Sequence, residues 1–248
     1  PWRLGGDSVQ DGGSVSGANV RGTIVNVVAV LVGSGIGLAV GNRLPERLQR
    51  IITTGLGLSV LLIGVQMAMK VQNMLVVIAS MVLGGVIGEL LGIEAGLERA
   101  GEWLKARART GSGTFVTGYV TASLVFCVGP MTIVGAIQEG MSGNAELIYT
   151  KSMLDGAASI AFASSLGVGV SFAAITVLVL QGALTLLGKQ LAFLLRPEIL
   201  NELTATGGLL ILGIGLLLLE VKRLRVANLL PALVVAVLLT AARLSLGW

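Results

Sequence analysis

Eight long apolar segments divide this chain and leave it few ways to fold. They run at about 22–42, 51–69, 72–92, 113–138, 147–166, 168–195, 203–221 and 226–246. Most approach the ~20 residues that a helix needs to cross ~30 Å of hydrocarbon. Because backbone groups inside a bilayer must bond within their own segment, each segment is predicted to be a helix. The pattern therefore predicts an all-α, polytopic membrane protein with about eight transmembrane helices.

The composition excludes a soluble domain and argues against a membrane β-barrel. Only 12% of the 248 residues are charged, whereas a soluble domain has roughly 25%, and the mean hydropathy is +0.90. Aromatic residues make up 4%, too few for the girdles of a barrel, while 36 glycines favour closely packed helices. We expect the lipid bilayer to be the main partner of the chain.

Several kinds of chemistry are absent from the sequence. The chain has no His and a single Cys127, which excludes a zinc site, a His-based proton relay, a Ser-His-Asp triad and an internal disulfide framework. We expect no enzymatic activity and no cofactor, with Na⁺ as the one candidate ion. The net charge of +4 sits in loops, where it orients membrane helices, so we expect no nucleic-acid partner.

A duplicated sequence pattern appears around Pro45 and Pro197. PERLQRIITTGLGL in the first copy matches PEILNELTATGGLL in the second at a constant offset of 152 residues. After three inserted residues the match resumes at an offset of 155, where Asn73 meets Asn228. Shared Pro, Glu, Thr, Lys and Asn residues are improbable chance matches in an apolar chain. We interpret the pattern as a duplicated three-helix unit, the usual skeleton of a secondary transporter.

The duplication organises the chain into parts. Residues 1–19 are polar and rich in Gly and Ser, which predicts a flexible extension, and 20–248 form a single transmembrane domain. That domain comprises repeat A at 21–93, an interfacial linker at 94–112, a central helix pair at 113–167 and repeat B at 168–248. An odd number of crossings separates the two repeats, which predicts that they are inverted. If segment four re-enters instead of crossing, the repeats are parallel.

The linker from Ile93 to Arg109 predicts a helix that lies in the membrane interface. Ile93, Leu97 and Leu104 fall near one helical face, charged residues occupy the rest, and Trp103 is a suitable interfacial anchor. A partner-binding helix is the alternative.

Gly129-Pro130 interrupts the apolar run of segment four. Proline removes a backbone donor and clashes with the preceding turn, so the helix should break or kink there. If it breaks, the first amides of the second half carry partial positive charge at membrane depth, where they could bind an anionic group. The predicted substrate site consists of Gly129, Pro130, Met131, Thr132, Ser123 and the polar Asn26 of segment one. A simple proline kink is the alternative.

Asp155 lies well inside apolar segment five. A carboxylate in hydrocarbon costs roughly 3 kcal/mol, and such residues usually carry function. Lys151, Ser152 and Ser159 lie on the same helical face. They predict an ion-coupling site in which Asp155 supplies charge and the serines supply oxygens. The alternative is a Lys151–Asp155 pair near the outer mouth with no transport role. Glu139, at the end of segment four, is expected to be solvated, and a place at the mouth of a pathway is the alternative.

Gly33, Gly37 and Gly41 recur at a spacing of four along segment one. This spacing places small residues on one helix face and favours tight packing against a neighbour. The neighbour is either another helix of the same chain or a second copy in a homodimer.

The central sequence CVGPMTIVGAIQEGMSG, followed by LIYTKSMLDGAASIAFASS, resembles the YqgA/YdfK family of bacterial inner-membrane proteins, as does the opening RGTIVNVVAVLVGSGIG. The resemblance covers about residues 20–246 and includes Gly129, Gln138, Gly140, Lys151 and Asp155. It implies a multi-pass protein of the bacterial inner (plasma) membrane and supplies no substrate.

Together, the duplication, the broken helix and the buried carboxylate predict a secondary transporter or exporter of a small solute. Na⁺ or H⁺ would drive it, and the substrate would bind between the repeats near Gly129-Pro130. A passive ion channel is one alternative. The other is a membrane scaffold or sensor that moves nothing, which a dry centre with Asp155 closed off by Lys151 would favour.

Overall fold

The computed structural model describes residues 20–41, 43–107, 113–222 and 224–246, and its regular structure in these ranges is helical. The helices are α1 (Arg21–Gly41), α2 (Glu46–Ala68), α3 (Met74–Leu91), α4 (Ile93–Arg107), α5 (Phe115–Cys127), α6 (Pro130–Ser142), α7 (Glu146–Leu166), α8 (Gly169–Leu186), η1 (Ala192–Leu195), α9 (Pro197–Leu218), η2 (Val226–Leu229) and α10 (Pro231–Ser245). The predicted all-helical fold is confirmed. The predicted extension at 1–19 and the end of the linker at 108–112 lie outside the described residues.

Six helical segments are long and apolar enough to cross a membrane: α1, α2, α3, α8, α9 and Val226–Ser245, which contains η2 and α10. The α5–α6 pair is apolar enough to be a seventh span, bent by 59° at its break. The chain is therefore a polytopic membrane protein. Helix α7 has 21 residues but carries Lys151 and Asp155, and it is not among the candidate spans. Length and composition thus support up to seven of the eight predicted spans.

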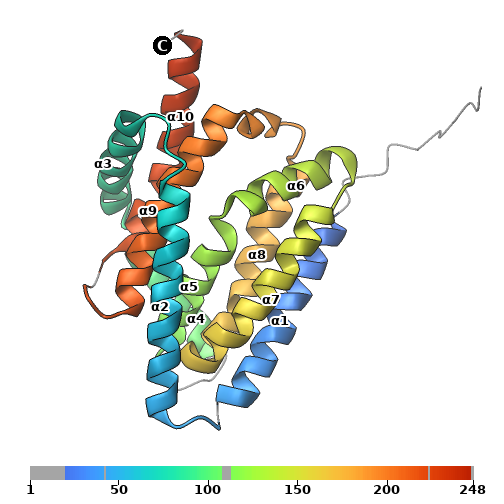
Figure 1. Ribbon diagram of the computed structural model, residues 1–248, viewed down its shortest axis with the longest axis vertical. Coiled ribbons are helices and arrows are strands. Elements are labelled where there is room, and N and C mark those ends of the chain that lie inside the picture. The colour runs from blue at the N-terminus through green and yellow to red at the C-terminus, as the bar shows by residue number, and fades with distance from the viewer. Residues whose placement is uncertain (1–19, 42, 108–112, 223, 247–248) are drawn as a thin grey trace, which may run out of the picture.

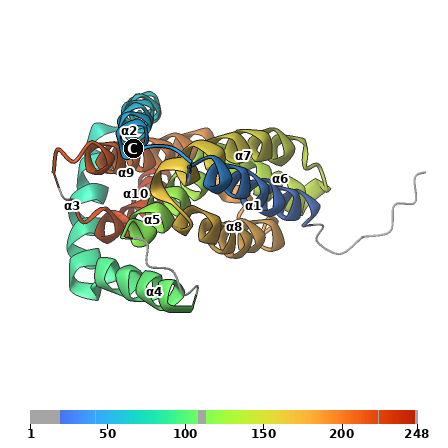
Figure 2. The ribbon, with the colours of Figure 1, turned by 90° about the horizontal axis from the view of Figure 1, so that it is seen from below.

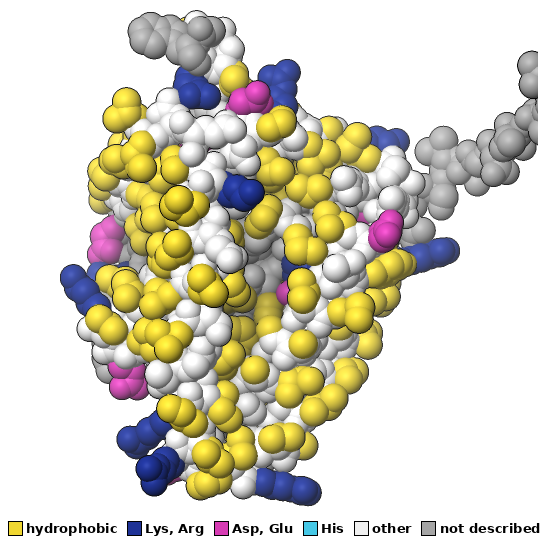
Figure 3. Space-filling view, in the orientation of Figure 1, with side chains coloured by type: hydrophobic (Ala, Val, Ile, Leu, Met, Phe, Trp, Pro, Cys, Tyr) yellow, Lys and Arg dark blue, Asp and Glu magenta, His cyan; other side chains and the backbone are white. Residues whose placement is uncertain are grey.

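The helices form two bundles (Figures 1 and 2). The α1 bundle consists of α1, α5, α6, α7 and α8, and the α9 bundle consists of α2, α3, α9 and α10. The bundles meet where α2 contacts α7 and where α5 contacts α9. Hydrophobic side chains are spread over the whole visible face, and few charged side chains interrupt them, as expected for helices that face lipid (Figure 3).

Small residues allow α1 and α7 to pack closely in a parallel arrangement. Gly33 and Gly37 of α1 lie against the backbone of Gly156 and Ile160 of α7, so closely that an added Cβ would overlap those carbonyl oxygens. The predicted glycine face therefore packs inside the chain. It no longer supports a homodimer, which remains an untested prediction.

Three further helix pairs run antiparallel, because their contacts fall in opposite order along the two partners. Between α1 and α8, Thr23 contacts Thr185 and Asn26 contacts Gln181. Between α2 and α9, Gly57 lies against Leu219, directly after α9, and Gly64 lies against Gly208. Between α3 and the η2–α10 segment, Gly84 lies against Ala232 and Gly88 against Asn228. Each of α1, α2 and α3 thus lies beside the helix that occupies the same place in the second half of the chain.

The duplicated prolines mark helix starts. Pro45 immediately precedes α2, and Pro197 is the first residue of α9. Proline is tolerated there because the first turn needs no backbone donor. Both helices consequently begin about one and a half turns before the predicted apolar segments at 51–69 and 203–221. The segment predicted at 168–195 is continuous α-helix only through Leu186.

The predicted helix break between α5 and α6 is confirmed. The start of α5 lies beside Gly169, at the beginning of α8, and Gly140 of α6 lies beside Thr185, near the end of α8. The bent pair therefore extends along the whole length of α8. Thr132 Oγ1 donates a 2.9 Å hydrogen bond to the carbonyl of Phe126, which satisfies one backbone acceptor that the break frees.

The predicted linker helix is present as α4. Gly101 packs against Val116 of α5, while Trp103 is exposed and the Arg107 guanidinium lies 5.4 Å from the centre of its ring. An exposed tryptophan beside a cation is typical of a helix at a membrane surface.

Candidate functional site

A buried charge pair lies in the middle of the α1 bundle. Lys151 Nζ donates to Asp155 Oδ2 across one turn of α7, and the two residues are only 5% and 8% exposed. The spacing of four places both side chains on the same face of the helix. Because an isolated charge in an apolar interior is far less stable than a paired one, each group depends on the other.

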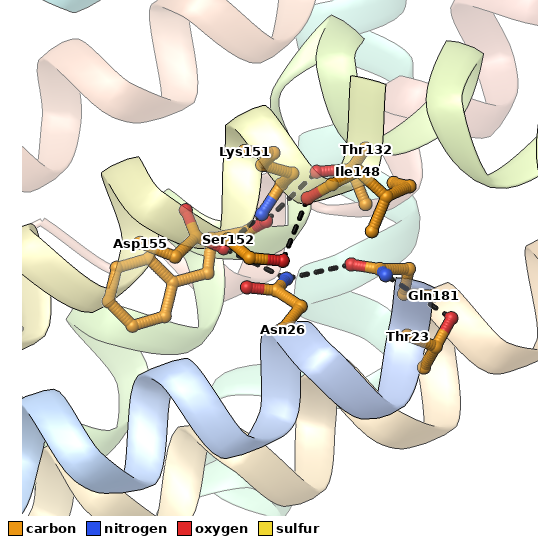
Figure 4. A network of polar contacts seen from close by, with 9 residues as sticks. Thr23, Asn26, Thr132, Ile148, Lys151, Ser152, Asp155 and Gln181 are labelled. Atoms are coloured by element: carbon orange, nitrogen blue, oxygen red, sulfur yellow. Dashed lines mark hydrogen bonds and ion pairs between the residues drawn. The ribbon is translucent and has the colours of Figure 1, made fainter. Parts of the chain in front are cut away.

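Amide side chains from α1 and α8 extend the site (Figure 4). Asn26 Nδ2 lies 3.1 Å from Asp155 Oδ2 and 2.9 Å from Gln181 Oε1. Gln181 Nε2 donates to Thr23 Oγ1 at 3.2 Å, and the hydroxyls of Thr23 and Thr185 lie 3.4 Å apart. Helical spacings of three and four keep Thr23 with Asn26 and Gln181 with Thr185, so two adjacent turns of each helix contribute.

Glu139 lies between this site and a cavity at the protein surface. Its carboxylate accepts a 2.6 Å hydrogen bond from the amide of Gly22, at the start of α1, and the residue is only 1% exposed. It also lines a cavity of about 410 Å³, whose other lining residues include Arg21, Glu146 and Tyr149. The expectation that Glu139 is solvated was wrong, because the N-terminal turn of α1 packs over it.

These residues form a chain of polar contacts within the α1 bundle. It runs from the cavity at Glu139, through Thr23 and Gln181, to Asn26 and the Lys151–Asp155 pair. We call this set of residues, together with Thr185, the polar chain. Asn26 Oδ1 and Glu139 Oε2 are buried and have no hydrogen-bond partner among the described residues. Each could therefore accept a bond from a water molecule or an ion.

The two serines predicted to supply oxygens behave differently. Ser152 Oγ donates to the carbonyl of Ile148 at 2.7 Å, a bond within α7, as is common for serine in helices. Ser159 Oγ is buried and has no hydrogen-bond partner in the described part of the chain. Only Lys151 among the predicted coupling partners touches Asp155 directly, and Asn26, assigned to the substrate, is its other partner.

The predicted substrate residues do not form one site. Asn26 belongs to the polar chain, and Thr132 bonds to the end of α5. Ser123 faces another cavity, where its hydroxyl donates to Thr176 at 3.0 Å. Gly129 has open space around it, since an added Cβ would meet nothing within 4 Å, and its neighbours Pro130 and Met131 are half-buried.

The sequence did not reveal the roles of Gln181, Thr23 and Thr185 or the burial of Glu139. Gln181 carried the same signal as Asn26, a lone amide in an apolar segment, and its significance appears only when α8 is known to pack antiparallel on α1. Gln66 gives the same signal but is exposed on α2. A lone polar residue therefore does not reveal by itself whether it faces the interior.

A separate polar cluster holds the start of α4 against η2. The Glu94 amide donates to Asn228 Oδ1 at 2.7 Å, and Glu94 Oε2 accepts from the Ala227 amide at 2.8 Å. Partial burial raises the pKa of the Glu94 carboxyl above its ordinary value, and the bond from the Ala227 amide offsets part of that rise. Glu89 bonds to both Asn228 and Arg225 nearby. This cluster caps helix ends.

Two relatives of this chain are named as uncharacterized proteins. The uncharacterized protein YqgA of Escherichia coli (strain K12) is 34% identical over 228 residues, covering 90% of this chain and 97% of the relative. The uncharacterized membrane protein YdfK of Bacillus subtilis (strain 168) is 29% identical over 218 residues, covering 86% and 93%. No solved structure matches the chain. The family model described as "Protein of unknown function (DUF554)" matches residues 21–241, and this chain belongs to that family.

Proposed function

We propose that this protein is a secondary transporter of a small solute in the bacterial plasma membrane, coupled to Na⁺ or H⁺ through Asp155. The observation that carries the proposal is the polar chain, which leads from a surface cavity to a buried charge pair. Charged and amide side chains are expensive inside a membrane bundle, and where they persist they usually mark an ion or proton pathway. Both relatives come from bacteria, and one is named a membrane protein.

The proposal includes eight crossings and two inverted repeats. Antiparallel packing of α1, α2 and α3 on α8, α9 and α10 supports it, since inverted units place equivalent helices in opposite directions. The α5–α6 pair extends along all of α8, and α7 lies along α1 from Gly22 to Gly41. The α5–α6 pair and α7 are therefore as long as α8 and α1, which are apolar enough to cross the membrane.

Labelling with an impermeant thiol reagent tests these crossings. In a Cys127→Ala background, single cysteines replace the exposed residues Arg43, Gly113 and Asn144. If the bent pair crosses, the cysteines at 43 and 113 react from one side of the membrane and the cysteine at 144 from the other. Labelling of 113 and 144 from the same side would mean that α5 and α6 form a re-entrant loop, which would contradict the inversion.

In the coupling step, an entering cation exchanges with the Lys151 ammonium. Asp155 is already neutralised by Lys151, so binding of a cation requires that ammonium to move away. Asn26, which bonds to Asp155, has a buried Oδ1 without a partner among the described residues, and this oxygen would complete the coordination together with the carboxylate. Val30, about one turn beyond Asn26, is fully buried.

A non-transporting scaffold or sensor is the second candidate. The observation that favours it is the closure of Asp155 by Lys151, which leaves the charge pair satisfied without any ligand. The two candidates differ in whether the pair exchanges its cation.

Thermal unfolding of the purified protein in Na⁺, K⁺, Li⁺ and choline chloride, across a range of pH, separates them. A transporter should be stabilised by one small cation, or by protons, through mass action. Asp155→Asn should remove that response, while Glu102→Gln, a change of an exposed carboxyl on α4, should keep it. An identical response in wild type and Asp155→Asn would refute the role of Asp155.

A further inference from the structure

An apolar cavity opens beside the helix break. Its volume is about 480 Å³, and it is lined from α5, α6, α8, η1, α9 and α10 by residues that include Leu124, Ile133, Leu184 and Leu203. This volume falls in the lower half of the ~300–1,000 Å³ range of small-molecule sites. It is distinct from the cavity at Glu139 and shares no lining residue with it among those described.

Three hydroxyl groups are the polar groups in the described part of this wall. Ser123 Oγ donates to Thr176 Oγ1 at 3.0 Å, and Thr176 Oγ1 donates to Tyr119 Oη at 3.1 Å. A hydroxyl can donate one bond and accept two. Among the described residues, the Tyr119 proton and the lone pairs of Ser123 have no further partner, so they could bond a ligand group. None of the described lining residues is Asp, Glu, Lys or Arg, so a charged ligand would lose its hydration without compensation.

One helix of the cavity wall also packs against the helix that carries the coupling pair. Cys127, the last residue of α5, lines the cavity, and α5 contacts α7, which carries Lys151 and Asp155. A ligand in this cavity would therefore contact a helix that packs on the ion-site helix, which is an arrangement that allows coupling.

We propose that the substrate is a single-chain amphiphile with a hydrocarbon body and one small, uncharged hydrogen-bonding head. The apolar wall would hold the hydrocarbon, and the Ser123–Thr176–Tyr119 hydroxyls would bind the head. A two-chain phospholipid is far larger than the drug-sized ligands that fill such volumes. This inference rests on the proposed transport function, because it names the substrate of that transporter.

The test compares three ten-carbon probes added to purified protein in nanodiscs of fixed phosphatidylcholine composition. They are n-decanol, n-decane and decyltrimethylammonium, and the readout is the melting temperature. Decanol should give a saturable rise, decane a smaller one and the cation none, because only decanol satisfies both the apolar wall and the hydroxyls. A larger rise with the cation than with decanol would overturn the proposal.

Two tryptophan variants separate the cavity from general effects of alcohol on the bilayer. Leu184→Trp fills the cavity and should abolish the decanol shift, whereas Leu178→Trp on the exposed face of the same helix should keep it. If Leu184→Trp does not fold, Ser123→Ala is the substitute, and it should reduce the decanol shift to that of decane. An equal decanol shift in wild type and these cavity variants would overturn the proposal.

The outcomes also separate this inference from the transport proposal. Asp155→Asn should still respond to decanol, because it changes the ion site alone. A cation response without a decanol shift would support the transport proposal and refute the amphiphile as its substrate. A decanol shift without any cation response in wild type would support the amphiphile-binding site and refute the coupling to a cation.

Discussion

The two bundles contain similar apolar helices but have different interiors. In the α9 bundle, α9 lies in the centre, with 72% of its apolar stretch buried. Helix α2 faces outward, with only 17% of its apolar stretch buried. Glycines such as Gly64 and Gly208 bring these helices together, and no ion pair is buried there among the described residues. In the α1 bundle, α7 packs against α1 and introduces Lys151 and Asp155. Helix α7 therefore supplies the buried ion pair.

The largest expected effect concerns how α7 is held in the α1 bundle. A side chain at Gly33 would overlap the backbone of Gly156, whereas Gly35 on the same helix has nothing within 4 Å of an added Cβ. Gly33→Val should therefore abolish the folded, monodisperse protein, since the backbones must separate. Gly35→Val should yield wild-type amounts in size-exclusion chromatography. Normal yield of Gly33→Val would show that α1 and α7 are not closely packed.

The next effect concerns the charge pair itself. Lys151→Met leaves the Asp155 carboxylate buried without its cation and should cost about 3–5 kcal/mol of stability. The double variant Lys151→Met/Asp155→Leu replaces both charges and should regain most of the loss in a thermal unfolding assay. The double variant should be stable yet unresponsive to cations. If it responds to cations as wild type does, the charge pair has no part in binding.

A smaller effect is expected in the α9 bundle. Glu202 of α9 accepts hydrogen bonds from the amides of Gln72 and Asn73, just before α3, at 3.1 and 2.5 Å. Glu202→Ala should lower stability by about 1–3 kcal/mol, because those amides lose their acceptor. Glu202→Gln keeps an acceptor oxygen and should recover much of the loss. Equal melting temperatures for Glu202→Ala and wild type would exclude this capping role.

The smallest effect lies at the edge of the α9 bundle, in the cluster around Glu94. Because the folded state raises the pKa of Glu94 above 4.5, ionisation is less favourable in the folded protein than in the unfolded one. Its contribution to stability is therefore greatest below pH 4.5 and is lost as the pH rises through the raised pKa. Glu94→Gln should flatten the melting temperature over that window, while the exposed Glu102→Gln should not.

The sequence was sufficient where one strong local rule decides. Apolar length identified the helices, and Pro130 identified the break, because proline cannot continue a helix ladder. Asp155 was recognisable because a carboxylate is costly in an apolar run and is usually kept there for a function. These features depend on neighbours in the chain, which a sequence displays directly.

The rest depended on contacts between distant residues. Asn26 and Gln181 are 155 residues apart, and only the antiparallel packing of α1 on α8 makes them partners. Glu139 was expected to be solvated at a helix end, but the first turn of α1 packs over it. The predicted substrate residues do not lie together for the same reason. Ser123 bonds to Thr176 of α8, whereas Thr132, beyond the break, bonds back to the end of α5. Side-chain direction across a bend is not encoded in spacing alone.

Exchange of cations at Asp155 is the step on which the proposed mechanism depends most directly. Proteoliposomes adsorbed on a solid-supported membrane, exposed to a rapid jump in Na⁺ concentration or pH, report charge movement on binding even without a known substrate. We predict a transient current in the wild-type protein and in Glu102→Gln, and none in Asp155→Asn. An unchanged transient in Asp155→Asn, or none in the wild type with either ion, would contradict the mechanism.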